Sequence, residues 1–144
     1  MGDTLDFLRV LWAVEHGLES RSKLMRKTLG ITGPQRLALR VLGRHPDITA
    51  TELASALHLH PSTISGVLSR LQQQGFISRG SARGDGRRAV LRLTAKGRQI
   101  DELSAGTVEA AVRSVLGRLP DAKVAAAREV LVALAEALLP HSLP

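Results

Sequence analysis

The feature that most constrains the fold of this chain is a change of hydrophobic period at Gly75. Before it, apolar side chains recur at helical spacing in two short runs, residues 49–57 and 61–74. After it, two strand-like runs, 76–79 and 89–93, flank a connection rich in glycine and arginine. The pattern therefore predicts two short helices followed by a β-hairpin with a flexible basic tip.

A long helix is predicted before this unit, followed by a second one. Two helix starts carry capping boxes, in which a threonine and a side chain three residues later satisfy each other's backbone N–H groups: Thr32 with Gln35, and Thr49 with Glu52. The first helix, over residues 4–28, has one apolar stripe at i, i+3, i+4, i+7 and i+11, formed by Phe7, Val10, Leu11, Val14 and Leu18.

Helical spacing returns after the hairpin. Thr94 is a suitable N-cap for a helix over about 95–118, and Pro120 separates it from a last helix over 121–139. The predicted fold class is therefore mainly α with a small β-hairpin.

The positive charge of the chain is concentrated in the helix–helix–hairpin unit. The 144 residues include 20 Lys and Arg against 13 Asp and Glu, a net charge of +7. Residues 61–98 hold eight of the basic side chains and one acidic one, so this stretch alone carries +7, whereas residues 1–60 and 99–144 carry +2 and −2. Such a patch indicates a polyanionic partner, either nucleic acid or an anionic membrane surface. With helix, helix and hairpin in this order, it predicts a winged helix-turn-helix that binds double-stranded DNA.

The second short helix has an outer face of small hydroxyl side chains, opposite its apolar face. A helix fits the major groove, where hydroxyl groups can hydrogen-bond base edges or phosphates. An arginine at the hairpin tip can enter the minor groove, and a neighbouring aspartate can hold that guanidinium in place. The predicted DNA-binding residues are Pro61, Ser62, Thr63, Ser65, Ser69, Arg70, Arg83, Asp85, Arg87 and Arg88.

Five short motifs between Thr49 and Gly97 resemble those of the MarR (multiple antibiotic resistance regulator) family of winged helix-turn-helix transcriptional regulators. They are Glu52-Leu53-Ala54, Pro61-Ser62-Thr63-Ile64-Ser65, Leu71-Gln72-Gln73-Gln74-Gly75-Phe76-Ile77, Asp85-x-Arg87 and Leu93-Thr94-Ala95-Lys96-Gly97.

This resemblance implies a homodimer with interlocked terminal helices, a palindromic operator, and release by a small anionic aromatic effector. It also implies recognition-helix contacts by Ser62, Thr63 and Ser65, and a wing contact by Arg87 that Asp85 supports. Gly66 and Gly86 depart from the family, which often has charged side chains there, so the operator sequence is left open.

Dimerisation is also expected on physical grounds. The long terminal helices carry more apolar surface than a winged domain can bury, and a self-complementary two-fold interface is the commonest way to cover such a stripe. We therefore expect a winged helix-turn-helix domain over residues 32–98 and a helical dimerisation region over 1–30 and 99–144.

A second face of the first helix carries the only tryptophan. Arg9, Trp12 and His16 are spaced i, i+3 and i+7, roughly opposite the apolar stripe. Either Trp12 packs in the dimer interface, or it stacks on a small phenolic or aromatic carboxylate effector whose charge binds Arg9 or His16.

Several classes of function are disfavoured. The chain has no cysteine, which excludes a disulfide framework and a thiol-ligated zinc site. No catalytic motif stands out, and the set His45, His58, His60 and Asp47 lacks the spacing typical of a metal site. We expect no enzymatic activity, no metal and no cofactor.

No apolar run is long enough to span a membrane, and the N-terminus shows no export signal, so a cytoplasmic protein without a membrane partner is expected. Two other interpretations stay open. One is a constitutive DNA-binding or architectural protein without an effector, and the other is an enzyme or metabolite-binding module with an incidental basic wing.

Overall fold

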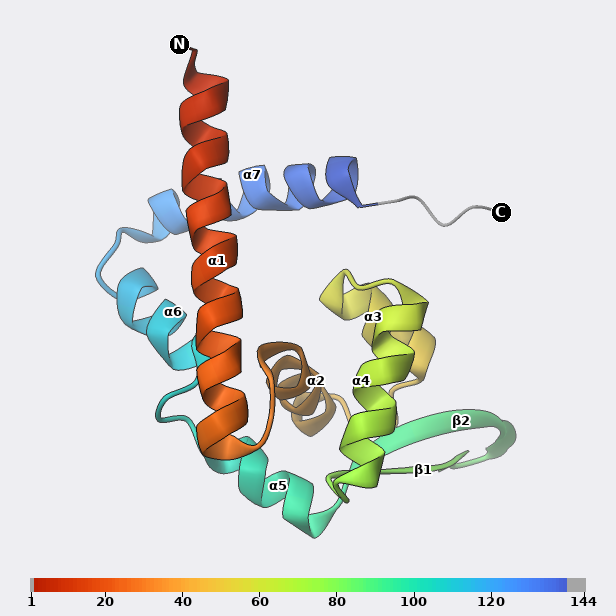
Figure 1. The fold of residues 1–144 in the computed structure, drawn as a ribbon. Helices are drawn as coiled ribbons and strands as arrows, with labels where there is room; N and C mark the ends of the chain where they lie inside the picture. The colour runs from red at the N-terminus through yellow and green to blue at the C-terminus, as the bar shows by residue number, and fades with distance from the viewer. Residues whose placement is uncertain (1, 140–144) are drawn as a thin grey trace. The chain divides into compact units, whose positions relative to one another are not determined.

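The computed structural model describes residues 2–139, and the chain divides into two compact units, residues 1–108 and 109–144. The described residues form seven α-helices and one two-stranded antiparallel sheet (Figure 1). The predicted fold class, mainly α with a small β-hairpin wing, is confirmed. None of the described helices combines the length and the apolar character needed to cross a membrane.

The first unit holds the helix-turn-helix and the hairpin. Its elements are α1 (Asp3–Leu29), α2 (Gly33–Arg44), α3 (Ala50–Leu57), α4 (Pro61–Gln73), β1 (Ile77–Ala82), β2 (Asp85–Leu93) and α5 (Ala95–Glu102).

Local signals set the helix ends as predicted. Gly30, with φ of 75°, ends α1, and Thr32 and Gln35 form the complete capping box at the start of α2. Gly75 follows α4 with φ of 79°, a left-handed conformation that favours glycine.

The second unit contains α7 (Asp121–Leu138) and most of α6 (Val108–Leu116), whose first residue belongs to the first unit. The prediction of one helix over about 95–118 is wrong. The chain leaves the helix at Leu103, which has an extended backbone, and passes through Gly106 at φ of 77°. Both conformations are incompatible with a continuous α-helix, whereas the predicted last helix is confirmed.

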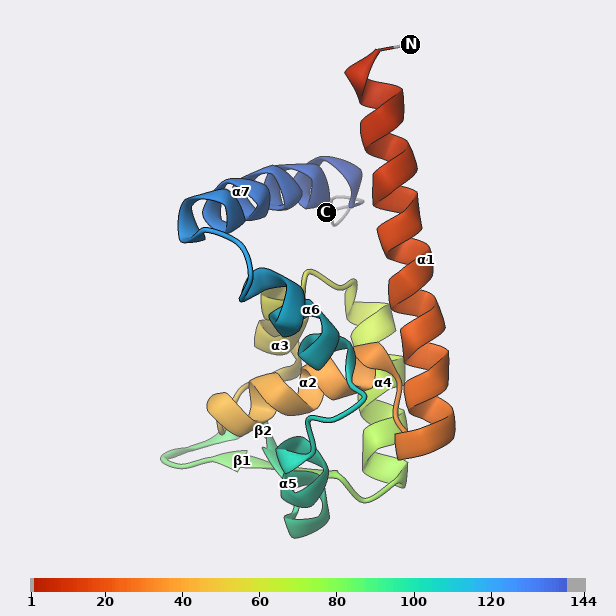
Figure 2. The same ribbon diagram turned by 90° about the vertical axis from the view of Figure 1, so that its left-hand side faces the viewer.

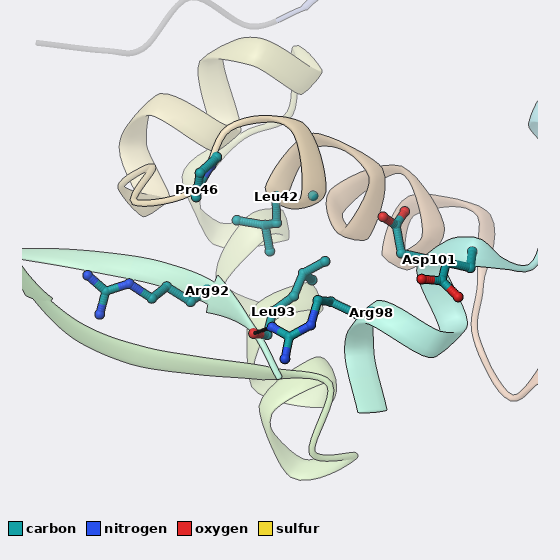
Figure 3. A pocket seen from close by; sticks show the side chains of 8 residues that line it. Leu42, Pro46, Arg92, Leu93, Arg98 and Asp101 are labelled. Atoms are coloured by element: carbon teal, nitrogen blue, oxygen red, sulfur yellow. Dashed lines mark hydrogen bonds between the residues drawn. The ribbon is translucent and has the colours of Figure 1, made fainter. Parts of the chain in front are cut away.

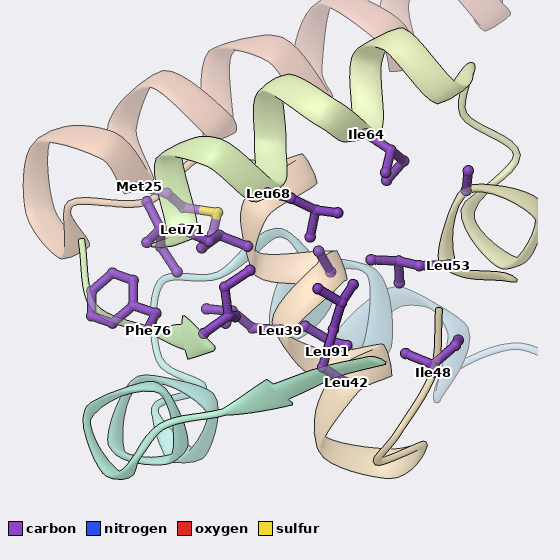
Figure 4. Packing of buried hydrophobic residues seen from close by; sticks show 14 residues of the cluster. Met25, Leu39, Leu42, Ile48, Leu53, Ile64, Leu68, Leu71, Phe76 and Leu91 are labelled. Atoms are coloured by element: carbon purple, nitrogen blue, oxygen red, sulfur yellow. The ribbon is translucent and has the colours of Figure 1, made fainter. Parts of the chain in front are cut away.

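The core of the first unit is built around α2, which contacts α1, α3, α4, α5 and β2. Figure 2 shows α2 crossing the middle of this unit, with the hairpin beside it. Residues from α1, α2, α3, α4 and β2 and from the chain between α4 and β2 bury their side chains together in the cluster of Figure 4, among them Met25, Leu39, Leu42, Leu53, Ile64, Leu68, Leu71, Phe76 and Leu91. The full burial of Met25 shows that the end of α1 belongs to the core of the winged domain.

The hairpin is longer and its tip shorter than predicted. We expected a flexible connection over residues 80–88, but β1 continues through Ala82 and β2 begins at Asp85. Pairing runs from Ile77↔Leu93 to Ser81↔Ala89 and then shifts to Ala82↔Asp85, so the strand bulges between Asp85 and Ala89. Gly84, with φ of 78°, permits the tight turn that closes the hairpin.

Candidate DNA-binding surface

The outer face of α4 carries the predicted contact residues in the expected orientation. Ile64, Leu68 and Leu71 are buried in the core, which fixes the rotation of the helix. The opposite side therefore faces solvent, and its exposed residues are Pro61, Ser62, Thr63, Ser65, Ser69 and Arg70. An ideal Cβ placed at Gly66, on the same face, meets nothing within 4 Å. This face of α4 is open to a partner.

The first turn of α4 is capped by a histidine. Nδ1 of His60 accepts the backbone N–H of Ser62 at 3.1 Å and lies 2.7 Å from the Ser62 hydroxyl oxygen. Because an Nδ1 that accepts an N–H carries no proton, the Ser62 hydroxyl also donates to it. Thr63, Ser65 and Ser69 make no such bond within the described part of the chain, so their hydroxyl groups remain available.

The eight basic side chains of residues 61–98 fall into two groups. Five have partners within the protein: Arg79 Nε donates to Gln72 Oε1 at 3.2 Å, Arg88 pairs with Glu52, Arg92 Nε lies 2.5 Å from Asp47 Oδ1, Lys96 Nζ donates to Gln74 O at 2.8 Å, and Arg98 Nη1 donates to Leu93 O at 3.2 Å.

The other three, Arg70, Arg83 and Arg87, are exposed and have no side-chain partner among residues 2–139. They lie near the end of α4 and at the tip of the hairpin. The basic side chains of the patch that have no partner among the described residues thus lie in two places, and these are the places where a winged helix meets DNA.

Asp85 supports the hairpin tip through the backbone. Its Oδ1 accepts the N–H of Arg87 at 3.1 Å, an Asx-type turn that shapes the chain beside the tip. Within the described residues no ion pair joins Asp85 to an arginine, so the expected grip on a guanidinium is absent from the free protein. Asp85 orients Arg87 by fixing its main chain.

Arg88 does not extend freely from the hairpin. Its guanidinium pairs with Glu52 in the first turn of α3. The sequence predicted a full capping box at this turn, but only the bond from Glu52 N to Thr49 Oγ1, at 3.1 Å, is formed, and the Glu52 carboxylate goes to Arg88 instead. Sequence reasoning missed this role of Glu52 because its partner lies 36 residues away.

A pocket between the end of α2, the end of β2 and the second half of α5 contains several charged side chains (Figure 3). Two of them are already paired: Asp101 Oδ1 lies 3.0 Å from Arg40 Nη1, and Arg92 pairs with Asp47. These pairs join α2 to α5 and the hairpin to the loop before α3, which gives the pocket walls a structural role. Among residues 2–139 no group of three or more histidine or acidic side chains is placed to hold a metal ion.

The predicted ligand residues Arg9, Trp12 and His16 are all exposed on α1. Trp12 is 62% exposed, and Arg9 Nη2 lies 3.6 Å from Asp6 Oδ1. The apolar stripe on the other face of α1 is also open to solvent, with Phe7 47% and Val10 59% exposed. Both faces of this helix are therefore available to a partner molecule.

Comparison with known proteins agrees with this geometry. The MarR family model matches residues 29–88, from the end of α1 through α4 to the tip of the wing. Over this segment, which is less than half of its length, the chain is similar to the MarR family. One curated relative is the HTH-type transcriptional repressor Rv2887 of Mycobacterium tuberculosis (strain ATCC 25618 / H37Rv), 34% identical over 91 residues. The aligned segment covers 63% of this chain and 66% of that relative, just under two thirds of its length.

Solved MarR-type structures share the fold over nearly the whole chain. A complex of S. aureus MepR with DNA has a TM-score of 0.74 at 20% identity, covering 92% of this chain and 98% of MepR. CouR from Rhodococcus jostii RHA1, bound to p-coumaroyl-CoA, has a TM-score of 0.76 at 22% identity, covering 99% of this chain and 96% of CouR. At these identities the similarity establishes the fold, while function rests on the residues described above.

Proposed function

We propose that this protein is a homodimeric transcriptional repressor of the MarR family that binds a palindromic DNA operator in the cytoplasm and catalyses no reaction. The observation that carries this proposal is the placement of the three unpaired arginines. Arg70, Arg83 and Arg87 stand at the end of α4 and at the wing tip, while the other basic side chains of the patch are held by the protein itself. The repressor Rv2887 and the DNA complex of MepR, both similar to this chain, support the same interpretation.

In the proposed complex, α4 enters the major groove. Thr63 and Ser65, near its N-terminus, reach base edges, and Ser62 and Ser69 lie on the same face. Arg70 neutralises backbone phosphate, whereas Arg83 and Arg87 enter the adjacent minor groove, where narrow A·T-rich DNA has the strongest negative potential. The helix therefore supplies most of the sequence preference and the wing most of the salt-dependent affinity.

We assign DNA binding to residues 32–98 and dimerisation to residues 1–30 and 99–144. The support is apolar surface that each compact unit leaves exposed. On α1 it includes Leu5, Phe7, Val10, Trp12, Val14 and Leu18, and in the second unit Val112, Val115, Leu116, Leu119, Val130, Leu131 and Leu138. A second copy covering these helices by two-fold symmetry sets two α4 helices against successive half-sites, about 34–36 Å apart.

The proposed effector is a small phenolic or aromatic carboxylate. Trp12 supplies an exposed aromatic ring, and Arg9 and His16 on the same face supply groups that bind an anion. Binding at the dimer helices lowers DNA affinity if it favours a spacing of the α4 helices that does not fit the operator. CouR, similar in fold, contains the aromatic acyl thioester p-coumaroyl-CoA.

Thermal unfolding with a panel of aromatic acids tests the effector. An acid that raises the melting temperature should raise it less in the Trp12→Ala and Arg9→Ala variants and should weaken operator binding. If no acid shifts the melting temperature, or if both variants respond as the unmodified chain does, the effector site is wrong. In that case DNA binding without an effector becomes the better description.

The function as a whole is tested by selecting bound duplexes from random DNA with the full chain. We expect enrichment of a two-fold-symmetric site with half-sites about one helical turn apart, bound by a species of twice the chain mass. A monomer in solution that enriches no sequence would contradict the proposal.

A further inference from the structure

Strand β2 of the wing is held at three successive points by the segment that leads into α3 and by the first turn of that helix. At the base, Arg92 pairs with Asp47, and next to it the N–H of Leu91 donates to the carbonyl oxygen of Ile48 at 2.9 Å. Nearer the tip, Arg88 pairs with Glu52. The Glu52–Arg88 pair is the last of these attachments, and the hairpin beyond it contains Arg83 and Arg87.

Both carboxylates leave a more ordinary local arrangement to make these pairs. Glu52 does not return to the N-cap of α3, where the positive end of the helix would favour its charge. Asp47 has φ of 68°, a left-handed conformation that is uncommon outside glycine. Glu52 and Asp47 therefore each adopt a less common arrangement, and each pairs with an arginine of β2. This agreement indicates that the two residues hold the wing.

We propose that Glu52 and Arg88 form a positioning pair that fixes the wing tip relative to α4, and that Arg88 is not itself a contact to DNA. This inference rests on the proposed DNA-binding function. A half-exposed ion pair contributes little to the stability of the fold, but it restricts the movement of a hairpin that is otherwise attached only at its base. Restricting the movement of the hairpin tip before binding reduces the conformational entropy lost when Arg83 and Arg87 enter the groove.

The first test measures the wing without DNA. The chain has no cysteine, so an Ala82→Cys substitution in the full chain gives one site for a nitroxide spin label beside the tip. Glu52→Gln should increase the label mobility seen in the electron paramagnetic resonance spectrum. The matched control is Glu19→Gln, which removes an exposed ion pair with Lys23 on α1 and should leave the spectrum unchanged. Equal spectra for Glu52→Gln and the unmodified chain would overturn the proposal.

The second test measures operator affinity in the unlabelled protein. Arg88→Gln should weaken binding about two- to fivefold, as expected for one exposed ion pair, with no change in the slope of log K against log salt. Reversing the pair, Glu52→Arg with Arg88→Glu, should restore most of the loss, because the attachment returns with opposite polarity.

A loss of slope of about 0.9 per subunit in Arg88→Gln would show that Arg88 contacts phosphate. No recovery in the reversed pair would show that the attachment between positions 52 and 88 does not set the affinity. Either result would refute the positioning role. If the unmodified chain binds no duplex at all, the proposed function fails. The spin-label spectra then still decide whether Glu52 holds the wing.

Discussion

Replacing Arg87 by glutamine should reduce the slope of log K against log salt for DNA binding. The size of the reduction follows from the absence of a partner for the Arg87 side chain within the described protein. Its guanidinium has no partner within residues 2–139, so when it enters the minor groove it neutralises the charge of a flanking phosphate without first breaking a contact in the protein. Each such contact contributes about 0.9 to the slope of log K against log salt. Two subunits therefore lose about 1.8 in slope, and at 0.15 M salt this corresponds to about a 30-fold loss of affinity.

The assay is fluorescence anisotropy of a labelled operator duplex at several salt concentrations. Arg98→Gln is the matched control, since it removes the same charge from a side chain that already donates to the carbonyl oxygen of Leu93 at 3.2 Å. The control should keep a slope close to that of the unmodified protein. If both variants lose the same slope, partnering within the protein does not decide which cations reach DNA, and the reasoning fails.

Three further predictions concern the helices of the winged domain. Gly66→Ala should raise the free energy of unfolding by about 1 kcal/mol, because alanine favours the helix and the added methyl group meets nothing within 4 Å. Gly97→Ala should lower the free energy of unfolding, because its Cβ would lie 2.0 Å from the carbonyl oxygen of Phe76. Chemical denaturation measures both changes, and a destabilised Gly66→Ala variant would contradict the open face of α4. Leu68→Ala should lower the free energy of unfolding by about 2–5 kcal/mol in the same assay because the side chain is fully buried, and a loss below about 1 kcal/mol would place it outside the core. Ser65→Ala should alter the ranking of operator variants in competition binding while leaving nonspecific affinity unchanged, and an equal loss on every sequence would make this hydroxyl a phosphate contact.

Local signals allowed most of the fold to be predicted from the sequence. The capping box of Thr32 and Gln35, the left-handed glycines Gly30 and Gly75, and the apolar spacing of α4 act within a few residues, and all appear in the structure as expected. The break between α5 and α6 was missed because helical spacing alone gave no weight to Gly106, whose φ of 77° turns the chain. The length of the hairpin was missed because a tip rich in glycine and arginine resembles a loop, although it pairs as strand up to Ala82.

The candidate site was predicted less completely, because side-chain pairing across the fold has no local signal. Arg87 and Arg88 are neighbours of the same chemistry, yet one is unpaired and the other is held by Glu52 on α3. Arg92 likewise pairs with Asp47, which is 45 residues away. A count of charges locates the basic patch, but only the folded chain separates cations that hold the wing from cations that are available to DNA.

The most direct test of the central claim is a nuclear magnetic resonance titration of the full, isotope-labelled chain with an operator duplex. If α4 and the wing tip form the DNA-binding surface, backbone amide shifts should concentrate in residues 61–70 and 82–88. Residues on the buried face of α2 should change little. Shifts that cluster elsewhere on the chain, or no shifts with any duplex at low salt, would contradict the account.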